Sequence, residues 1–265
     1  MTAAPPYNTN LSKAQGIIPE TLELLDLWQL GMSAAQLKAR VRETGALGKA
    51  TQTRVDDVVG RGFAQRYLSG TEQPAAHLKR MAAEGSLRGV LRQLFLVYTA
   101  RSQRVLHDFI TEVFWLKANS RNAEITKEDA RDFLERAKSG GKTHSTWTPT
   151  MTEKVTRYLL GTLEDFEWII ENRFGHRQIR PPAILHETVL YLAYDLHFHG
   201  VEDAALPRHP DWHLFGLMPV HVIGLLEKLA AQGHAQVQNA GAILRIEWEY
   251  PHMEAVVDAI IDRKV

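Results

Sequence analysis

Apolar side chains recur at helical spacing along nearly the whole chain, and the widest stripe that they form runs through residues 101–119. It consists of adjacent apolar pairs that repeat every four residues: Val105 and Leu106, Phe109 and Ile110, and Val113 and Phe114. A stripe two positions wide can be packed against by several neighbours, so this segment is predicted to be the central helix of an all-α, mainly helical fold. Narrower stripes and end signals predict further helices at residues 19–30, 73–84, 86–98, 126–138, 150–171, 183–198, 220–232 and 252–262.

The chain has 265 residues, of which 45% are hydrophobic, and can therefore bury a substantial core in one domain or two. The Pro181-Pro182 pair marks a boundary, because the residue before a proline is pushed out of helical geometry. We expect a helical core in residues 1–180 and an acidic part packed on it in residues 181–265. Beyond Gly233 the periodicity predicts a small β-hairpin with its turn at residues 239–241. A hairpin between helices is typical of a winged helix, used here to dock protein rather than DNA.

Charge is distributed unevenly, although the formal net charge of the whole chain is zero. Residues 33–104 carry thirteen basic and five acidic side chains, whereas the residues from 195 onward carry five basic and ten acidic ones. A neutral chain is not expected to coat nucleic acid indiscriminately, but a strongly basic segment suits a polyanion. The basic segment is therefore where a binding site is expected.

Residues 33–68 have the order of a helix-turn-helix, in which one helix braces a second that reaches a nucleic-acid groove. Ser33 is the expected N-cap of the first helix, and Gly45 and Gly48 bracket the turn because glycine accepts positive φ angles. The alternative is a solvated helical hairpin, since arginines on an amphipathic helix usually face water. Cationic side chains and two threonine hydroxyls in this segment are expected to contact phosphates: Lys38, Arg42, Lys49, Thr51, Thr53, Arg54 and Arg61.

A second, weaker helix-turn-helix candidate surrounds the glycine turn that follows residue 138, where a plain helical hairpin is the favoured interpretation. Lys142, Lys154 and Arg157 gather around this turn and are expected to extend the footprint on DNA. Trp147 stands in a polar linker and is expected to anchor that linker to the core.

Several kinds of chemistry lack support in the sequence. The chain has no cysteine, so disulfides and thiolate sites are excluded, and it has neither a secretory signal nor an apolar run near the about 20 residues needed to span a bilayer. We expect a soluble, cytoplasmic protein. Two lookalikes of a phosphate loop, SGGKT and GALGKAT, have Arg136 and Glu43 where the first glycine belongs. No enzyme activity, cofactor or metal is expected.

A metal site is the alternative for the histidine-rich residues 195–213. It is disfavoured because His197 and His199 would point about 200° apart on a helix.

Several short motifs resemble the BrxA proteins of bacteriophage exclusion (BREX) defence systems. They are Tyr7 with the following NTNLSK, Gly16, the Pro19-Glu20-Thr21 helix start, the KATQTRV segment from residue 49 to 55, and the spacing of Trp147, Thr150 and Lys154. The resemblance covers most of the first 170 residues and is less clear in the C-terminal part. It implies a small, all-helical, non-enzymatic protein with an architecture similar to the antitermination factor NusB and able to bind double-stranded DNA. Its partners would be a DNA methyltransferase, an ATPase and a phosphatase-like protein.

The sequence thus predicts a non-enzymatic accessory protein that binds the DNA backbone with weak sequence preference and strong salt dependence. A binder of structured RNA is the first alternative. The second is an adaptor whose acidic C-terminal part recruits other subunits, and a metal-dependent enzyme is the third.

Overall fold

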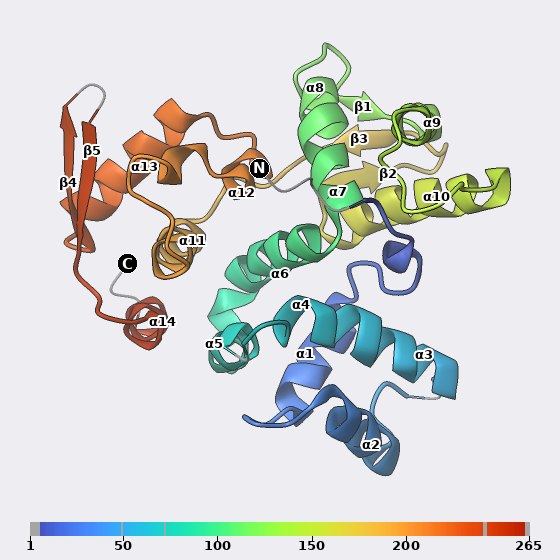
Figure 1. Ribbon diagram of the computed structural model, residues 1–265, viewed down its shortest axis with the longest axis horizontal. Coiled ribbons are helices and arrows are strands. Elements are labelled where there is room, and N and C mark those ends of the chain that lie inside the picture. Colours follow the sequence, from blue (N-terminus) through green and yellow to red (C-terminus); the bar gives the residue numbers. More distant parts are fainter. Residues whose placement is uncertain (1–5, 49, 72, 241–242, 263–265) are drawn as a thin grey trace. The chain divides into compact units, whose positions relative to one another are not determined.

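The chain forms two compact units, each built from two segments (Figure 1). The computed structural model of the protein describes residues 6–48, 50–71, 73–240 and 243–262. Unit 1 comprises residues 1–79 and 95–182, and unit 2 comprises residues 80–94 and 183–265. The break after Pro182 lies close to the boundary expected at the proline pair. Residues 80–94 join unit 2 through long-range contacts, such as the Gln93 side chain, which bonds the carbonyl of Ala183 and the amide of Leu185.

Helices make up most of unit 1, so the expected mainly helical fold is confirmed. They are α1 Ile18–Leu27, α2 Ala34–Thr44, α3 Gln52–Asp56, α4 Gln65–Tyr67, α7 Arg104–Phe109, α8 Trp115–Ala118, α9 Lys127–Ser139 and α10 Pro149–Asp165. The π-helical segment η2 (Asp57–Ala64) joins α3 to α4, and η4 (Ile110–Phe114) joins α7 to α8. The residues of α5 (Gln73–Ala82) and of α6 (Arg88–Ser102) are divided between the two units. The stripe predicted in residues 101–119 thus becomes a helical run from Arg104 to Ala118.

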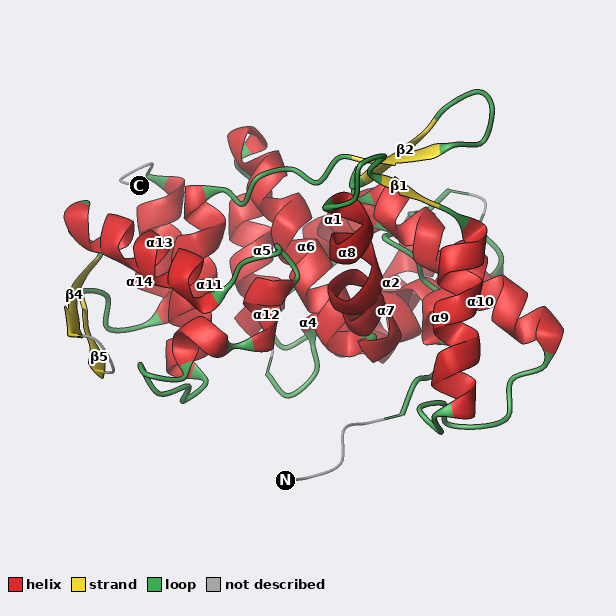
Figure 2. Cartoon of the chain, turned by 90° about the horizontal axis from the view of Figure 1, so that it is seen from above, coloured by secondary structure: helices red, strands yellow, loops and turns green. Residues whose placement is uncertain are grey.

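Three very short strands accompany these helices and were not predicted. β1 (Glu124–Ile125) and β2 (Ile169–Glu171) both pair antiparallel with β3 (Arg177–Ile179), which lies between them in Figure 1. Figure 2 shows how little strand the protein contains beside its helices. The predicted helix over residues 150–171 is wrong beyond Asp165. Glu167 takes a positive φ of 61°, and the amide of Trp168 bonds back to the carbonyl of Leu163 over 2.8 Å, which ends the helix. The turn buries Trp168 against the aromatic rings of Phe114 and Trp115.

An N-terminal strap, residues 6–17, crosses unit 1 and is bonded to segments far along the chain. The Tyr7 amide donates to the carbonyl of Lys142, and the Tyr7 hydroxyl donates to Asp108 over 2.7 Å. At the other end, the buried guanidinium of Arg66 donates to the carbonyls of residues 14, 15 and 16. The Gly16 amide donates to Asp165 at the end of α10. The strap therefore links α4, α7 and α10.

Asp108 makes the strap sensitive to acid. Burial alone raises its pKa, but hydrogen bonds from His107, Tyr7 and Arg104 outweigh that effect and lower the pKa to about 2, from 3.8. Because the folded pKa is depressed, ionised Asp108 stabilises the fold above about pH 4, and this contribution is lost as the pH falls towards 2. We expect D108N to lower the free energy of unfolding by about 2 kcal/mol at pH 7 and by progressively less below pH 4.

Urea unfolding at pH 7, 4 and 3, followed by tryptophan fluorescence, measures this effect. The exposed Asp132 on α9 supplies the matched control, D132N, which is expected to unfold like the wild type at every pH. A pH-independent loss in D108N would contradict the assigned role of the carboxylate.

Unit 2 combines helices with one hairpin. Its elements are η3 Gly85–Leu87, α11 His186–Phe198, η5 Leu206–Arg208, α12 Pro210–His213, α13 Pro219–Ala231, β4 Ala235–Ala240, β5 Ile243–Trp248 and α14 Met253–Ile261. The predicted hairpin is confirmed, with Ala235 opposite Trp248 and Ala240 opposite Ile243. Its predicted turn at residues 239–241 is placed too early, because Asn239 and Ala240 still pair within the sheet, and residues 241–242 lie outside the described part of the chain. Tyr194 on α11 anchors it, because the Tyr194 hydroxyl accepts the amides of Glu249 and Tyr250 just after β5.

Candidate nucleic-acid interface

The α2–α3 surface, formed by α2, α3 and η2, contains most of the residues predicted to contact DNA. Ser33 caps α2 as expected, since its hydroxyl accepts the Gln36 amide while its own amide donates to the Gln36 side chain. Gly45 follows α2 with a φ of 70°, which lets the chain turn towards α3. The two predicted helices are therefore present and joined by the predicted glycine turn.

Carboxylates neutralise the cations on the α2–α3 surface. Asp56 pairs with both Lys38 and Arg42, at 3.2 Å and 3.3 Å. Hydrogen bonds from Gln52 and Lys38 lower the pKa of Asp56, so this carboxylate stays ionised beside the two cations. Arg61 pairs with Asp57 over 2.7 Å.

Two of the remaining residues predicted on this surface, Arg54 and Thr51, are also engaged in contacts within the protein. Arg54 donates to the carbonyl of Lys13 in the strap and to Glu20 on α1. The Thr51 hydroxyl accepts the Arg54 amide and so caps α3, and Thr53 is exposed in the first turn of that helix. Lys49 lies outside the described residues.

Lys142 is separated from this surface and belongs to the strap region. Its amino group lies 3.1 Å from Glu112 and 5.9 Å from the centroid of the Tyr7 ring. Trp147, in the same loop between α9 and α10, is 4% exposed, which confirms that it anchors the linker to the core.

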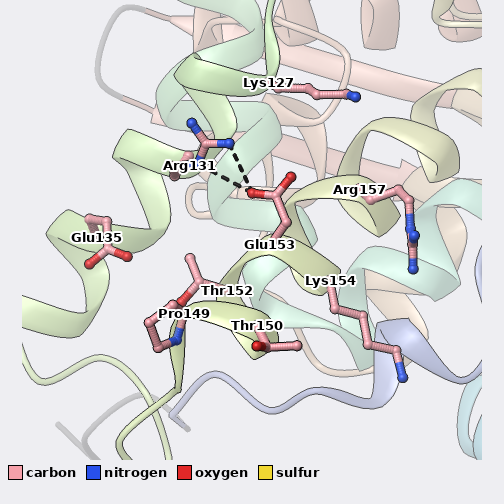
Figure 3. Close-up of a pocket in the computed structure, with 9 residues that line it drawn as sticks. All are labelled: Lys127, Arg131, Glu135, Pro149, Thr150, Thr152, Glu153, Lys154 and Arg157. Atoms are coloured by element: carbon pink, nitrogen blue, oxygen red, sulfur yellow. Dashed lines mark hydrogen bonds and ion pairs between the residues drawn. The ribbon is translucent and has the colours of Figure 1, made fainter.

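Lys154 and Arg157 lie in a different place, the α9–α10 groove, which has a volume of about 690 Å³ (Figure 3). One row of side chains from each helix lines the groove, and the members of a row recur about every helical turn. The row on α9 contains Lys127, Arg131 and Glu135, and the row on α10 contains Thr150, Glu153, Lys154 and Arg157. Thr126 and Thr148 cap the two helices by accepting the amides of residues 129 and 151, so the start of each row is fixed by local hydrogen bonds.

Three cations in this groove remain available to a ligand. Among the residues that the structure describes, Lys127, Lys154 and Arg157 have no carboxylate within ion-pair distance. Arg131, the fourth cation, pairs with Glu153 across the groove. Thr150 adds an exposed hydroxyl in the first turn of α10, where the helix dipole favours negative charge. The arrangement suits phosphate groups.

Two carboxylates and a further cation lie near the end of α10. A smaller hollow of about 210 Å³ shares Lys127 and Arg157 with the groove and continues past Glu164 and Asp165. Partial burial, together with the nearby carboxylates of Glu20 and Glu164, raises the pKa of Asp165. Glu164 also pairs over 2.8 Å with Arg177, which lines the same hollow.

Lys127 and Arg131 were not among the residues predicted to contact DNA. Both stand on the helix predicted at residues 126–138, four positions apart, and this spacing is the signal that would have placed them on one face. They lie outside the most basic segment, residues 33–104, and outside the helix-turn-helix pattern of residues 33–68.

The histidine-rich residues 195–213 do not converge. His197 stacks on Trp248 of the hairpin, with ring centroids 4.5 Å apart, whereas the His199 side chain bonds the carbonyl of Asp195. Within the described part of the chain, no three histidine or carboxylate side chains are placed to hold a metal ion. Nor does any helix in that part combine the length and hydropathy needed to cross a membrane.

Comparison with known proteins identifies the fold and the family. A crystal structure of an uncharacterized protein from Magnetospirillum magneticum is similar, with a TM-score of 0.60, 16% sequence identity, and coverage of 74% of this chain and 96% of that chain. At this identity the similarity concerns the fold alone. No curated protein matches the sequence significantly. The BrxA family model matches residues 5–195, which is most of the chain and includes unit 1 and α11 almost entirely. The resemblance seen in the sequence motifs is thereby confirmed: the chain belongs to the BrxA family, and so to the BREX systems of phage defence.

Proposed function

We propose that this protein is a non-enzymatic accessory subunit of a BREX system that binds the backbone of double-stranded DNA, with the α9–α10 groove as its principal contact. The α2–α3 surface and Lys142 form a secondary contact, because their cations must break ion pairs with carboxylates before they can bind phosphates. The protein works beside the methyltransferase, the ATPase and the phosphatase-like protein of the system.

The observation that carries this proposal is the set of three cations in the groove that have no carboxylate partner among the described residues. Lys127 projects from α9, and Lys154 and Arg157 project from α10 (Figure 3). Long cationic side chains on rigid helices bind phosphates without reading bases, so they fix position rather than sequence. We therefore expect weak sequence preference, because these phosphate contacts do not require a helix or strand to enter a groove of the DNA.

Salt dependence tests both the binding and the size of the contact. Each phosphate neutralised on duplex DNA contributes about −0.9 to the slope of log K against log salt, so three groove contacts give a slope of about −3. If all eight cations predicted from the sequence bound phosphates, the slope would be about −7. Fluorescence anisotropy with a labelled duplex of about 20 base pairs, from about 50 to 200 mM salt, measures it. An affinity that does not change with salt would exclude phosphate binding.

A competition experiment separates this function from binding of structured RNA. Unlabelled duplex DNA and an RNA hairpin of equal charge are added to the complex of the protein with labelled duplex. We expect the DNA to displace the label at the lower concentration. Displacement by RNA at a much lower concentration would assign the groove to RNA instead.

A further inference from the structure

Arg131 and Glu153 form an ion pair that bridges the two walls of the α9–α10 groove. Arg131 Nη2 donates to Glu153 Oε2 over 2.9 Å, and Nε donates to the same oxygen over 3.3 Å (Figure 3). The two side chains are 43% and 52% exposed, so water reaches both of them and the pair is weak enough to exchange. The pair lies in the same groove as the unpaired Lys127 and Lys154.

Arg131 attracts a phosphate group, whereas Glu153 repels it. A guanidinium presents its N–H donors as a planar fork that fits a carboxylate and a phosphate equally well. Glu153 now takes up part of that fork, and its negative charge repels any phosphate held by the neighbouring lysines. Removing the carboxylate would therefore free a fourth phosphate ligand and remove a repulsion.

We propose that Glu153 stands in the place of a phosphate in the α9–α10 groove and competes with the nucleic-acid backbone for Arg131. This inference rests on the proposed function and adds to it the group that limits the affinity of the groove. Binding of a backbone phosphate exchanges one partner of Arg131 for another. When no nucleic acid is bound, the phosphate site at Arg131 is thus occupied by a carboxylate of the protein itself.

A second carboxylate near Arg131 provides a matched control. Glu128 lies 3.8 Å from Arg131 Nη1 and is 69% exposed, and it does not line the groove. E128Q removes the same charge from a contact with the same arginine, but outside the groove. The two variants therefore distinguish competition inside the groove from a change in net charge.

The experiment measures binding of a labelled duplex of about 20 base pairs to the full-length protein by fluorescence anisotropy. We expect E153Q to bind about five- to tenfold more tightly than the wild type, with a salt slope steeper by about 0.9 as Arg131 joins the contact. E128Q should change the affinity less than twofold. The double variant R131Q/E153Q should lose most of the gain, and thermal unfolding verifies that each variant is folded.

Each other outcome has a defined meaning. Equal tightening by E153Q and E128Q would overturn the inference, because charge alone would explain it. An unchanged or weaker E153Q, with a wild type that binds duplex and a K154Q variant that binds less, would overturn the inference and leave the proposed function standing. Binding by E153Q but not by the wild type would support the competition, and it would overturn the proposal that the wild-type protein binds DNA by itself. Absence of binding in both would overturn both proposals.

Discussion

The triple variant K127Q/K154Q/R157Q is expected to bind duplex DNA about a thousandfold more weakly than the wild type at about 0.1 M salt. The release of about 0.9 counterion for each neutralised phosphate is worth roughly one decade of affinity at that salt, and three contacts are lost. None of the three side chains has a carboxylate partner among the described residues, so their loss leaves no internal charge unpaired. The fold should be retained, and anisotropy titration of the labelled duplex gives the ratio of dissociation constants.

The control variant carries the same change of charge on the α2–α3 surface. K38Q/R42Q/R61Q removes three cations that are paired with Asp56 and Asp57, and we expect a loss of about threefold or less. If this variant lost more affinity than the groove variant, the principal contact would be the surface predicted from the sequence.

Replacing Arg66 by methionine should destabilise unit 1 strongly. The guanidinium is 4% exposed and donates to the carbonyls of Ala14, Gln15 and Gly16, at 2.6, 2.6 and 3.2 Å. Three carbonyl oxygens each lose a donor worth about 1–3 kcal/mol, whereas removal of a buried cation recovers part of its desolvation. The net loss of unfolding free energy should be about 3 kcal/mol, which lowers the midpoint of thermal unfolding by about 6–12 °C for a chain of this size.

Calorimetry of R66M beside R61M tests this expectation. Arg61 is on the same helical run, its side chain is 52% exposed, and its replacement should shift the free energy of unfolding by about 0.5 kcal/mol at most. Limited proteolysis should also cut the strap of R66M sooner. An R66M variant as stable as R61M would show that the carbonyls of residues 14–16 find other donors.

Features set by neighbouring residues were predictable from the sequence. Ser33 and Thr126 cap their helices through residues three positions ahead, and the stripe of apolar pairs at residues 105–114 is buried. The hairpin was predictable because alternation and a turn signal lie within fifteen residues. Lys154 and Arg157 were predicted together with Lys142 around one turn, and these two do line one groove, being three positions apart on α10, whereas Lys142 lies beside Glu112 and Tyr7.

Features set by distant residues were not predictable. The helix of residues 150–165 ends where it does because Trp168 is buried against Phe114 and Trp115, more than fifty positions earlier in the chain. The strands β1 and β3 are also paired across more than fifty positions. The same limit applies to the cations, since Arg54 is neutralised by Glu20, 34 positions away. Charge counted along the sequence overestimates the charge that a surface offers.

The strap also determines when unit 1 is completed during synthesis. Tyr7 needs Asp108, 101 positions later, and Gly16 needs Asp165, 149 positions later. At about 5–20 residues per second, the ribosome makes Asp165 on the order of ten seconds after Gly16. The beginning of the chain must wait that long for its partners, and the nascent protein meanwhile exposes the apolar surfaces that the strap will cover.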